Sequence, residues 1–270
     1  MKVLRDPASG GVDPGTGSVV TIGAFDGVHL GHRAVLRLVR ELADARGLQA
    51  ALVTFDRHPA EIVRPESAPR LLTNLEHRLE LLDATGLLDV CVVLTFDEAR
   101  SHESAEDFVH EVLVGLLRAR LVVVGADFHF GHKRGGNVPL LEQMGADLGF
   151  EVLGLGLVAP ADGSVPFSST RVRELLGAGD VEGAAAVLGR PHELRGRLEN
   201  GVLTVDSRAC LPAPGRYEGT VREGERAPRA VALEVGGRDR HDPAAITVAA
   251  GSATGSESGT PAAVCFGVPG

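Results

Sequence analysis

The chain has 270 residues, of which 44% are hydrophobic and 23% charged, a composition typical of a globular protein with one large domain and a smaller appendage. Its formal net charge of −9 argues against a broad nucleic-acid surface, because such surfaces need clustered positive charge. No stretch approaches the roughly 18 apolar residues of a membrane span, and the N-terminus carries no apolar signal segment. We therefore expect a cytoplasmic protein that binds neither nucleic acid nor membrane. The 3 cysteines lie far apart and predict neither a disulfide framework nor a cysteine zinc site.

Short apolar runs alternate with segments of helical period from Val19 to about Leu188, which is the pattern of βαβ units and a parallel sheet. The expected strands are Val19–Ile22, Ala50–Phe55, Val90–Phe96, Leu121–Gly125 and Phe150–Leu157. Ser104 with Asp107 predicts a helix start, because a serine three residues before an acid is a loose capping box. The fold class is therefore α/β, with a five-stranded parallel sheet.

The character of the sequence changes after Gly189-Arg190-Pro191 to short β-like runs separated by turn residues such as Asn200-Gly201. We expect residues 1–190 to form the α/β domain and residues 191–250 to form a small β-rich appendage. The segment 251–270 is rich in Gly, Ser, Thr and Ala, and this composition predicts a flexible tail.

A glycine-rich turn, GAFDGVHLGH from Gly23 to His32, follows the first expected strand and leads into the first expected helix. Backbone N–H groups at a helix N-terminus favour anions, and ligands of open parallel sheets gather at the carboxyl ends of the strands. Gly23, Gly27 and Gly31 permit a tight turn and a close approach of phosphate oxygens. His29 and His32 can donate hydrogen bonds to those oxygens, so the turn predicts a phosphate site.

Other interpretations of this turn stay open at this point. His29 and His32 are equally suited to capping or packing at a helix start. Zinc binding by the pair is less favoured, because a third ligand at recognisable spacing is not evident. Asp26 also suits an Asx-turn, and Phe25 also suits the core.

A second oxyanion site is indicated at Ser168-Ser169-Thr170, which precedes Arg171, Arg173 and a helical run. Hydroxyls, a helix N-terminus and a guanidinium then meet in one place, and each of them binds phosphate oxygens. The alternative is an ordinary serine cap with solvated arginines.

Aromatic and polar residues mix after two further strands. GADFHFGHKRGGN from Gly125 to Asn137 follows the fourth expected strand, and FDRHP from Phe55 to Pro59 ends the second. Aromatic rings beside hydrogen-bond donors and an acid suit a planar heterocycle. Alternatively, Phe128 and Phe130 are core residues of a loop and the basic cluster is a solvated turn.

Four of these segments, in this order, resemble the adenylyltransferase module of the FAD synthetase family, the bacterial bifunctional riboflavin kinases and FMN adenylyltransferases. They are IGAFDGVHLGH, FDRHP, GADFHFGHKRGG and SSTRVR, across roughly Val19 to Pro191. The resemblance implies a Rossmann-like nucleotidyltransferase fold and the reaction ATP + FMN → FAD + diphosphate, with Mg2+. The metal ligands stay unassigned.

The resemblance also implies the roles of individual residues. His29, His32 and Arg173 would act in catalysis on the ATP phosphates, assisted by Ser168, Ser169 and Thr170. The turn residues Gly23, Phe25, Asp26 and Gly31 would complete that site. The flavin and the FMN phosphate would be lined by Phe55, His58, Pro59, Asp127, Phe128, Phe130 and Arg134. Ala24 stands where family members often have Asn.

The sequence departs from the family beyond Pro191. A full member carries a β-barrel riboflavin kinase module with a Pro-Thr-Ala-Asn tetrapeptide, which is absent here. We therefore expect a shortened remnant of that module, without kinase activity. Two rival functions stay open: a nucleotidyltransferase for another phosphorylated acceptor, and a catalytically silent flavin-binding or regulatory protein.

Overall fold

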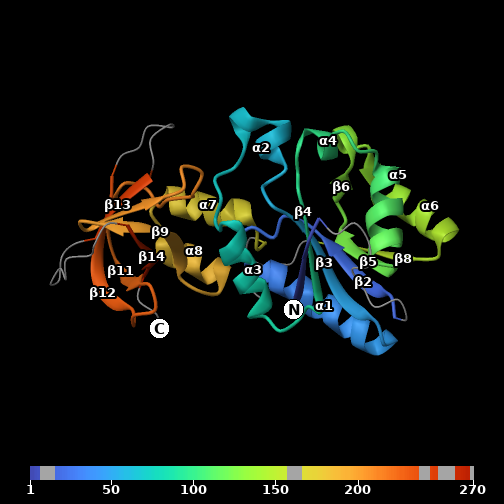
Figure 1. Cartoon of the computed structure of the whole chain (residues 1–270), viewed down its shortest axis with the longest axis horizontal. Coiled ribbons are helices and arrows are strands. Elements are labelled where there is room, and N and C mark those ends of the chain that lie inside the picture. The colour runs from blue at the N-terminus through green and yellow to red at the C-terminus, as the bar shows by residue number, and fades with distance from the viewer. Residues whose placement is uncertain (7–15, 157–165, 237–243, 249–258, 268–270) are drawn as a thin grey trace. The chain divides into compact units, whose positions relative to one another are not determined.

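The computed structural model describes residues 1–6, 16–156, 166–236, 244–248 and 259–267 (Figure 1). The chain forms two compact units. The first comprises Met1–Pro69 and Leu75–Pro166, and the second comprises Arg70–Asn74 and Phe167–Gly270. The short segment Arg70–Asn74 thus belongs with the C-terminal part of the chain, although its sequence neighbours on both sides belong to the first unit.

The first unit is built on a six-stranded parallel sheet in the order β1-β4-β3-β2-β5-β8. Its strands are β1 (Lys2–Arg5), β2 (Ser18–Ile22), β3 (Gln49–Phe55), β4 (Val90–Leu94), β5 (Ala119–Gly125) and β8 (Glu151–Leu155). Its helices are α1 (Leu30–Arg46), α2 (Ala60–Val63), α3 (Leu75–Asp83), α4 (Glu98–Ser101), α5 (Ala105–Phe108), the π-helix η2 (Val109–Leu116) and α6 (Val138–Leu148), with 3-10 turns η1 (Pro65–Ser67) and η3 (His132–Arg134). A small antiparallel pair joins β6 (His129–Phe130) to β7 (Gly136–Asn137).

Helices cover both faces of the sheet. Successive residues of a strand point to opposite faces, so neighbours in β2 pack against different helices. Val19 packs in a cluster with Leu36 of α1 and Leu82 of α3. Its neighbour Val20 packs in another cluster, with Phe108 of α5 and residues of η2 and α6. Burial on both faces explains why the central strands read as continuous apolar runs.

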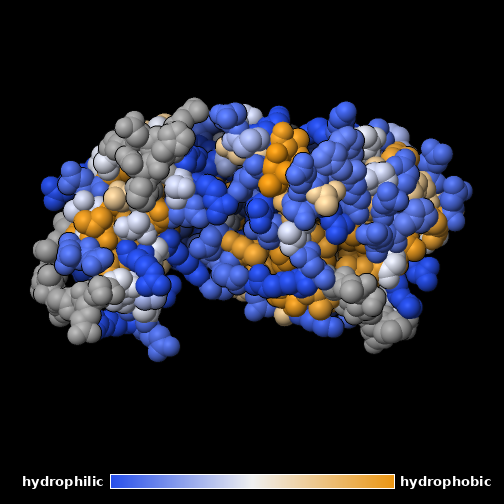
Figure 2. All heavy atoms as spheres, turned by 45° about the horizontal axis from the view of Figure 1, so that its top comes forward, coloured by the Kyte–Doolittle hydropathy of each residue, from blue (hydrophilic) through white to orange (hydrophobic). Residues whose placement is uncertain are grey.

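The outer surface of the protein is mainly hydrophilic in the face shown in Figure 2, and apolar residues reach it in a few groups. The exposed large apolar side chains of the described residues are Val3, Val63 and Leu153. Of the helices in the described ranges, none combines the length and the apolar character that crossing a membrane requires.

The α/β class is confirmed, and each of the five expected strands is present with ends that differ by a few residues; Leu157, the expected end of the last one, lies outside the described residues. The sheet has a sixth strand. Lys2–Arg5 forms β1 and pairs in parallel with β4 at the edge of the sheet. This edge strand is largely exposed and too short to show an apolar period. The cap at Ser104 is also confirmed, since its side chain accepts a hydrogen bond from the Asp107 N–H (2.9 Å).

The second unit contains two helices, α7 (Ser169–Gly177) and α8 (Val181–Leu188), and a closed antiparallel barrel in the order β10-β13-β12-β11-β14-β9. The barrel strands are β9 (His192–Glu199), β10 (Val202–Val205), β11 (Gly215–Glu223), β12 (Arg229–Val235), β13 (Ala244–Val248) and β14 (Thr260–Phe266). The expected turn Asn200-Gly201 joins β9 to β10, and both residues have positive φ angles, 49° and 78°, as a tight hairpin turn requires.

The expectation of a flexible tail from Gly251 is wrong for residues 260–266. They form β14, which pairs with β9 and β11 and closes the barrel. Val264 and Phe266 are fully buried in the barrel core. Residues 251–258 of the expected tail lie outside the described residues. The first compact unit also ends at Pro166 rather than at 190, because α7 and α8 cluster with the barrel side of the chain.

Candidate active site

Three loops of the first unit leave the sheet side by side at its carboxyl edge. They follow β2, β3 and β5, and β2 lies between the other two strands. Strand β3, which follows β2 in the chain, pairs with one edge of β2, and β5, which comes later, pairs with its other edge. The boundary between β2 and β5 is therefore a topological switch point, where open parallel sheets bind their ligands.

The loop after β2 is tightly constrained. Phe25, Gly27 and Val28 all have positive φ angles, of 49°, 83° and 41°, and a branched residue such as valine rarely adopts this conformation. The ring of Phe25 and the side chain of Val28 are buried in the core below the loop, which holds the strained backbone in place. The core interpretation of Phe25 is therefore what the structure shows, and its ring also stacks on His32, with centroids 4.5 Å apart.

His29 caps α1, as the capping interpretation expected. Its Nδ1 accepts a hydrogen bond from the backbone N–H of His32 (3.3 Å). In a neutral ring the proton then lies on Nε2, which can donate to an anion. The rings of His29 and His32 stack with centroids 3.6 Å apart. Capping would not conflict with the phosphate contact expected for His29, since the cap uses Nδ1 and that contact would use Nε2.

Phe55 is the last residue of β3, and the loop after it carries the expected residues His58 and Pro59. His58 Nδ1 accepts a hydrogen bond from the Ala60 N–H (3.1 Å), and the backbone N–H of His58 donates to the Glu61 carboxylate (2.9 Å). His58 and Pro59 are half-buried. These bonds fix the start of α2 and hold the imidazole of His58 at the sheet edge.

Asp56 ties this loop to the end of β4. It accepts hydrogen bonds from the Arg57 guanidinium (2.9 Å) and from the Phe96 N–H (2.9 Å). Burial opposes the charged carboxylate, but these hydrogen bonds and the Arg57 charge outweigh it, so the pKa of Asp56 lies below its ordinary value.

Arg78 is a candidate site residue that the sequence interpretation missed. It lies on α3 and is 2% exposed, and its guanidinium donates to the carbonyl of Phe55. Its Nε is buried and has no partner among the described residues. Burial lowers the pKa of Arg78, while the charge of Asp26, itself buried, acts in the opposite direction. The sequence held one signal that Arg78 is buried: it follows Leu75 by three residues, which puts both side chains on the same, apolar face of the helix.

The loop after β5 places its two phenylalanines differently. Phe130 is 9% exposed and belongs to the core, where it meets Phe108. Phe128 is half-buried and stacks on Phe130 with centroids 5.4 Å apart, while Asp127 is exposed. The core interpretation therefore holds for Phe130, and Asp127 and Phe128 are the residues of this group nearer to solvent.

The same loop closes tightly around Gly131. The φ angle of Gly131 is 70°, and a Cβ there would lie 2.7 Å from the Ala105 nitrogen. The following residues Lys133 and Arg134 also have positive φ angles, 50° and 61°, and both are exposed. His132 anchors the loop, since its N–H donates to the Glu103 carbonyl (2.7 Å).

The Ser-Ser-Thr-Arg segment lies in the second unit and opens α7. Ser168 is the N-cap, and its Oγ accepts from the Arg171 N–H (3.1 Å). Ser169 and Arg173 are half-buried and Thr170 is exposed. The serine cap is therefore present, at the end of a helix where backbone N–H groups in general favour anions.

Metal ligands do not cluster in the part of the chain that the structure describes: no group of three or more His, Cys, Asp or Glu side chains there could hold a metal ion. The free thiols of Cys91 and Cys210 are buried, and burial raises the pKa of Cys91 to about 12. Both pack in buried apolar clusters.

A parallel sheet with a glycine-rich turn and a helix N-terminus at its switch point places the first unit in the Rossmann-like α/β class. The family model for FAD synthetase matches residues 13–171, which is more than half of the chain. The protein belongs to the FAD synthetase family.

Similar proteins carry both activities of the bifunctional enzymes in their names. The chain is 35% identical over 201 residues to the bifunctional riboflavin kinase/FMN adenylyltransferase of Escherichia coli K12, covering 74% of this chain and 63% of that one. It is 39% identical over 185 residues to the protein of the same name from Pseudomonas fluorescens, covering 68% and 58%. The chain thus spans about three fifths of the length of these relatives.

A solved structure described as a macrolide-efflux protein from Streptococcus pneumoniae is similar in fold, with a TM-score of 0.79. It is 22% identical, and the match covers 98% of this chain and 90% of that one. At this identity the likeness concerns the fold alone.

Proposed function

We propose that this protein is an FMN adenylyltransferase, which forms FAD and diphosphate from FMN and ATP. The stacked pair His29–His32 at the N-terminus of α1, beside the switch point, carries the proposal. The match to the FAD synthetase family supports the choice of FMN as acceptor.

In this reaction a phosphate oxygen of FMN bonds to the α-phosphorus of ATP, and the bond from that phosphorus to the oxygen bridging to the β-phosphate breaks. The attacking phosphate is already anionic, so the protein needs to supply position and charge neutralisation rather than a base. His29 and His32 would donate to the phosphate oxygens on which negative charge grows. Arg173, Ser169 and Thr170 would bind the phosphates as well.

On the acceptor side, we propose that Asp127 and Phe128 contact the flavin and that Phe55, His58, Pro59 and Arg134 complete its site. Phe130 would act from below, because its ring supports that of Phe128. The exposed side chain of Arg134 suits a phosphate group.

Mg2+ would enter with ATP. This fits the donor set of the described residues, which contains no cluster of three ligands, since Mg2+ is commonly held by substrate phosphates with one or two carboxylates. The ion would neutralise charge on the departing diphosphate.

We further propose that the protein has no riboflavin kinase activity. The connection from β10 to β11, residues 206–214, reads DSRACLPAP and contains no Pro-Thr-Ala-Asn tetrapeptide. The β9–β10 connection is a two-residue turn, which leaves no room for that tetrapeptide there either.

A chromatographic product assay with Mg2+ and ATP tests both proposals, using riboflavin and FMN as alternative acceptors. FAD from FMN, and no FMN from riboflavin, is the expected result. If no FAD forms from FMN, the adenylyltransferase proposal is wrong; diphosphate release with another phosphorylated acceptor would then favour the rival transferase. FMN from riboflavin would show that the barrel retains kinase activity.

A further inference from the structure

The segment Arg70–Asn74, which we call the strap, is part of the second unit. It lies between η1 and α3 in the sequence, and nothing in its composition (RLLTN) marks it as separate from the α/β domain. Within the second unit it touches both the barrel and α7, the helix that carries Arg173. It is therefore one part of the chain through which the barrel can act on the Ser-Ser-Thr-Arg segment, beside the direct hydrogen bond from the Ala213 N–H to the Leu176 carbonyl of α7 (2.8 Å).

Main-chain hydrogen bonds attach the strap to the loop after β10. The Leu71 N–H donates to the Arg208 carbonyl (2.8 Å), and the Cys210 N–H donates to the Leu71 carbonyl (2.8 Å), so that Leu71 and Ala209 form a parallel bridge. The guanidinium of Arg70 donates to the carbonyl of Ser207. A strand-like pairing of this kind fixes the strap in both position and direction.

The loop is in turn held by the barrel core. Nε2 of His192, a residue 2% exposed, hydrogen-bonds to the Cys210 carbonyl (2.9 Å). The imidazole of His192 stacks on Phe266 of β14 with centroids 6.2 Å apart, and Phe266 is fully buried. The strand that closes the barrel therefore supports the loop that holds the strap.

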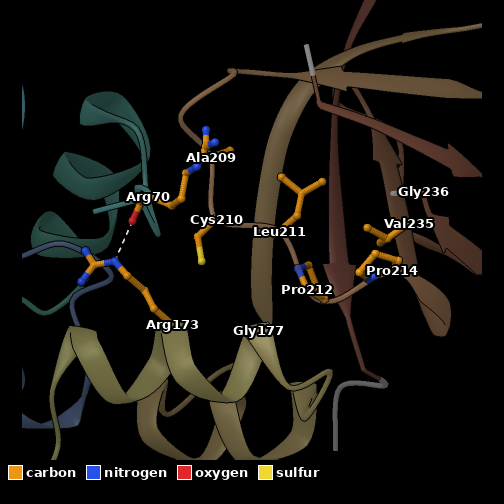
Figure 3. A pocket seen from close by; sticks show the side chains of 10 residues that line it. All are labelled: Arg70, Arg173, Gly177, Ala209, Cys210, Leu211, Pro212, Pro214, Val235 and Gly236. Carbon is orange, nitrogen blue, oxygen red and sulfur yellow. Dashed lines mark hydrogen bonds between the residues drawn. The ribbon is translucent and has the colours of Figure 1, made fainter. Parts of the chain in front are cut away.

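The strap meets α7 through one polar and several apolar contacts. Nε of Arg173 donates to the Arg70 carbonyl (2.6 Å). Figure 3 shows this bond, with the two terminal nitrogens of Arg173 pointing away from the Ala209–Pro212 loop. Leu72 of the strap packs in one buried cluster with Val172 and Leu176 of α7 and with Cys210. Anchoring a guanidinium through Nε sets its plane, because the group is rigid and planar.

A cavity of about 340 Å³ lies beside this bond, between α7 and the barrel loop. Its walls include Arg70, Arg173, Leu211 and Pro212 (Figure 3). The Arg173 side chain is therefore not packed on all sides, and the Arg70 carbonyl is a contact that restrains it at this wall.

We propose that the barrel serves adenylyl transfer as a scaffold that orients Arg173 through the strap. The inference rests on the proposed function. Leu71, Arg70 and Cys210 act as positioning residues, and the retained barrel has a role that needs no kinase chemistry. Because a misplacement of about 1 Å can cost roughly a hundredfold in rate, a main-chain fixation is well suited to this task.

The test compares two substitutions at one position in the full-length chain. Leu71→Pro removes the N–H that donates to Arg208, whereas Leu71→Val keeps it. We expect Leu71→Pro to lower kcat for FAD formation by roughly ten- to a hundredfold, and Leu71→Val to stay within about threefold of the wild type. Circular dichroism checks that both variants are folded.

Each variant is also made in an Arg173→Ala background. If the strap acts through Arg173, Leu71→Pro causes no further loss of kcat there; a further loss of the same size would overturn the proposal, because it indicates general damage to the fold. Should Leu71→Pro fail to fold, Arg70→Ala replaces it, with an expected three- to tenfold loss that Arg70→Lys restores.

The outcomes separate the two proposals. A wild type that forms no FAD overturns the proposed function together with the scaffold role. A wild type that forms FAD, and a folded Leu71→Pro variant with unchanged kcat, overturns the scaffold role alone.

Discussion

The imidazole of His29 lies against that of His32, with ring centroids 3.6 Å apart, and its Nδ1 accepts the backbone N–H of His32. This single contact combines a helix cap with a pair of donors at the switch point of the sheet. It also separates two roles of His29 that substitution can distinguish, since the cap uses Nδ1 and the proposed phosphate contact uses Nε2.

We expect His29→Asn to keep α1 capped, because asparagine is among the best N-cap residues, and to lower kcat for FAD formation by roughly 100- to 1000-fold, the typical cost of one lost oxyanion donor. His29→Ala should lose the same activity and, in addition, about 0.5–2 kcal/mol of stability. Steady-state kinetics and urea unfolding measure the two effects. Full activity of His29→Asn would rule out the catalytic role.

Arg78→Met should destabilise the first unit by about 1–3 kcal/mol, because the partly buried carbonyl of Phe55 loses this donor. Arg78→Lys keeps a cation near Asp26 and should lose less. Arg37→Met on the exposed side of α1 is the control and should change stability by less than about 0.5 kcal/mol. Urea unfolding of the three variants provides the measurement, and equal effects of Arg78→Met and Arg37→Met would contradict the role given to Arg78.

Asp56→Asn should reduce stability at neutral pH but not in acid. The folded-state pKa of Asp56 is lowered, so its contribution is fully present above the ordinary pKa of 3.8 and is lost as the pH falls through the lower folded value. The difference in unfolding free energy between wild type and variant should thus be constant from pH 7 to 5 and shrink below about pH 4. A difference that grows in acid would mean that the sign is wrong.

Gly131→Ala should lower stability by more than the backbone strain of an alanine at a positive φ angle, because a Cβ there would also clash with Ala105. A Cβ at Gly131 would lie 2.7 Å from the Ala105 nitrogen, whereas Gly149, with a φ of 80°, has no atom within 4 Å of a Cβ. Gly149→Ala therefore measures backbone strain alone, about 1–2 kcal/mol. We expect a larger loss for Gly131→Ala by thermal unfolding, together with a raised KM for FMN; equal losses would show that Ala105 yields without cost.

Phe266→Ala should cost about 3–5 kcal/mol, the usual range for a buried phenylalanine. Pro261→Ala, at an exposed position of the same strand, should change stability by less than about 1 kcal/mol. Urea unfolding followed by circular dichroism distinguishes them. A neutral Phe266→Ala variant would mean that residues 260–266 behave as a tail after all.

Much of the fold could be predicted because buried parallel strands such as Val90–Leu94 read as continuous apolar runs and their covering helices show a clear period. The edge strand Lys2–Arg5 carries no such signal, since it is short and largely exposed. Strand Thr260–Phe266 follows a segment of low-complexity composition, which concealed it. Its place in the barrel depends on the pairing of Val264 with Leu194 and Val221, which are distant in sequence.

The sequence by itself determined the glycine-rich turn before α1, the cap at Ser168 and the order of the four family segments, because these depend on neighbouring residues and on local backbone conformation. Only the tertiary structure decided that Phe25 and Phe130 are core residues, that Arg78 is buried beside the turn, and that the strap pairs with the barrel loop. Burial, charge proximity and strand pairing join residues far apart in the chain, so the local pattern allowed core positions for Phe25 and Phe130 but did not decide them. The turn from Gly23 to His32 is therefore a local feature, whereas the site built around it is a product of the whole fold.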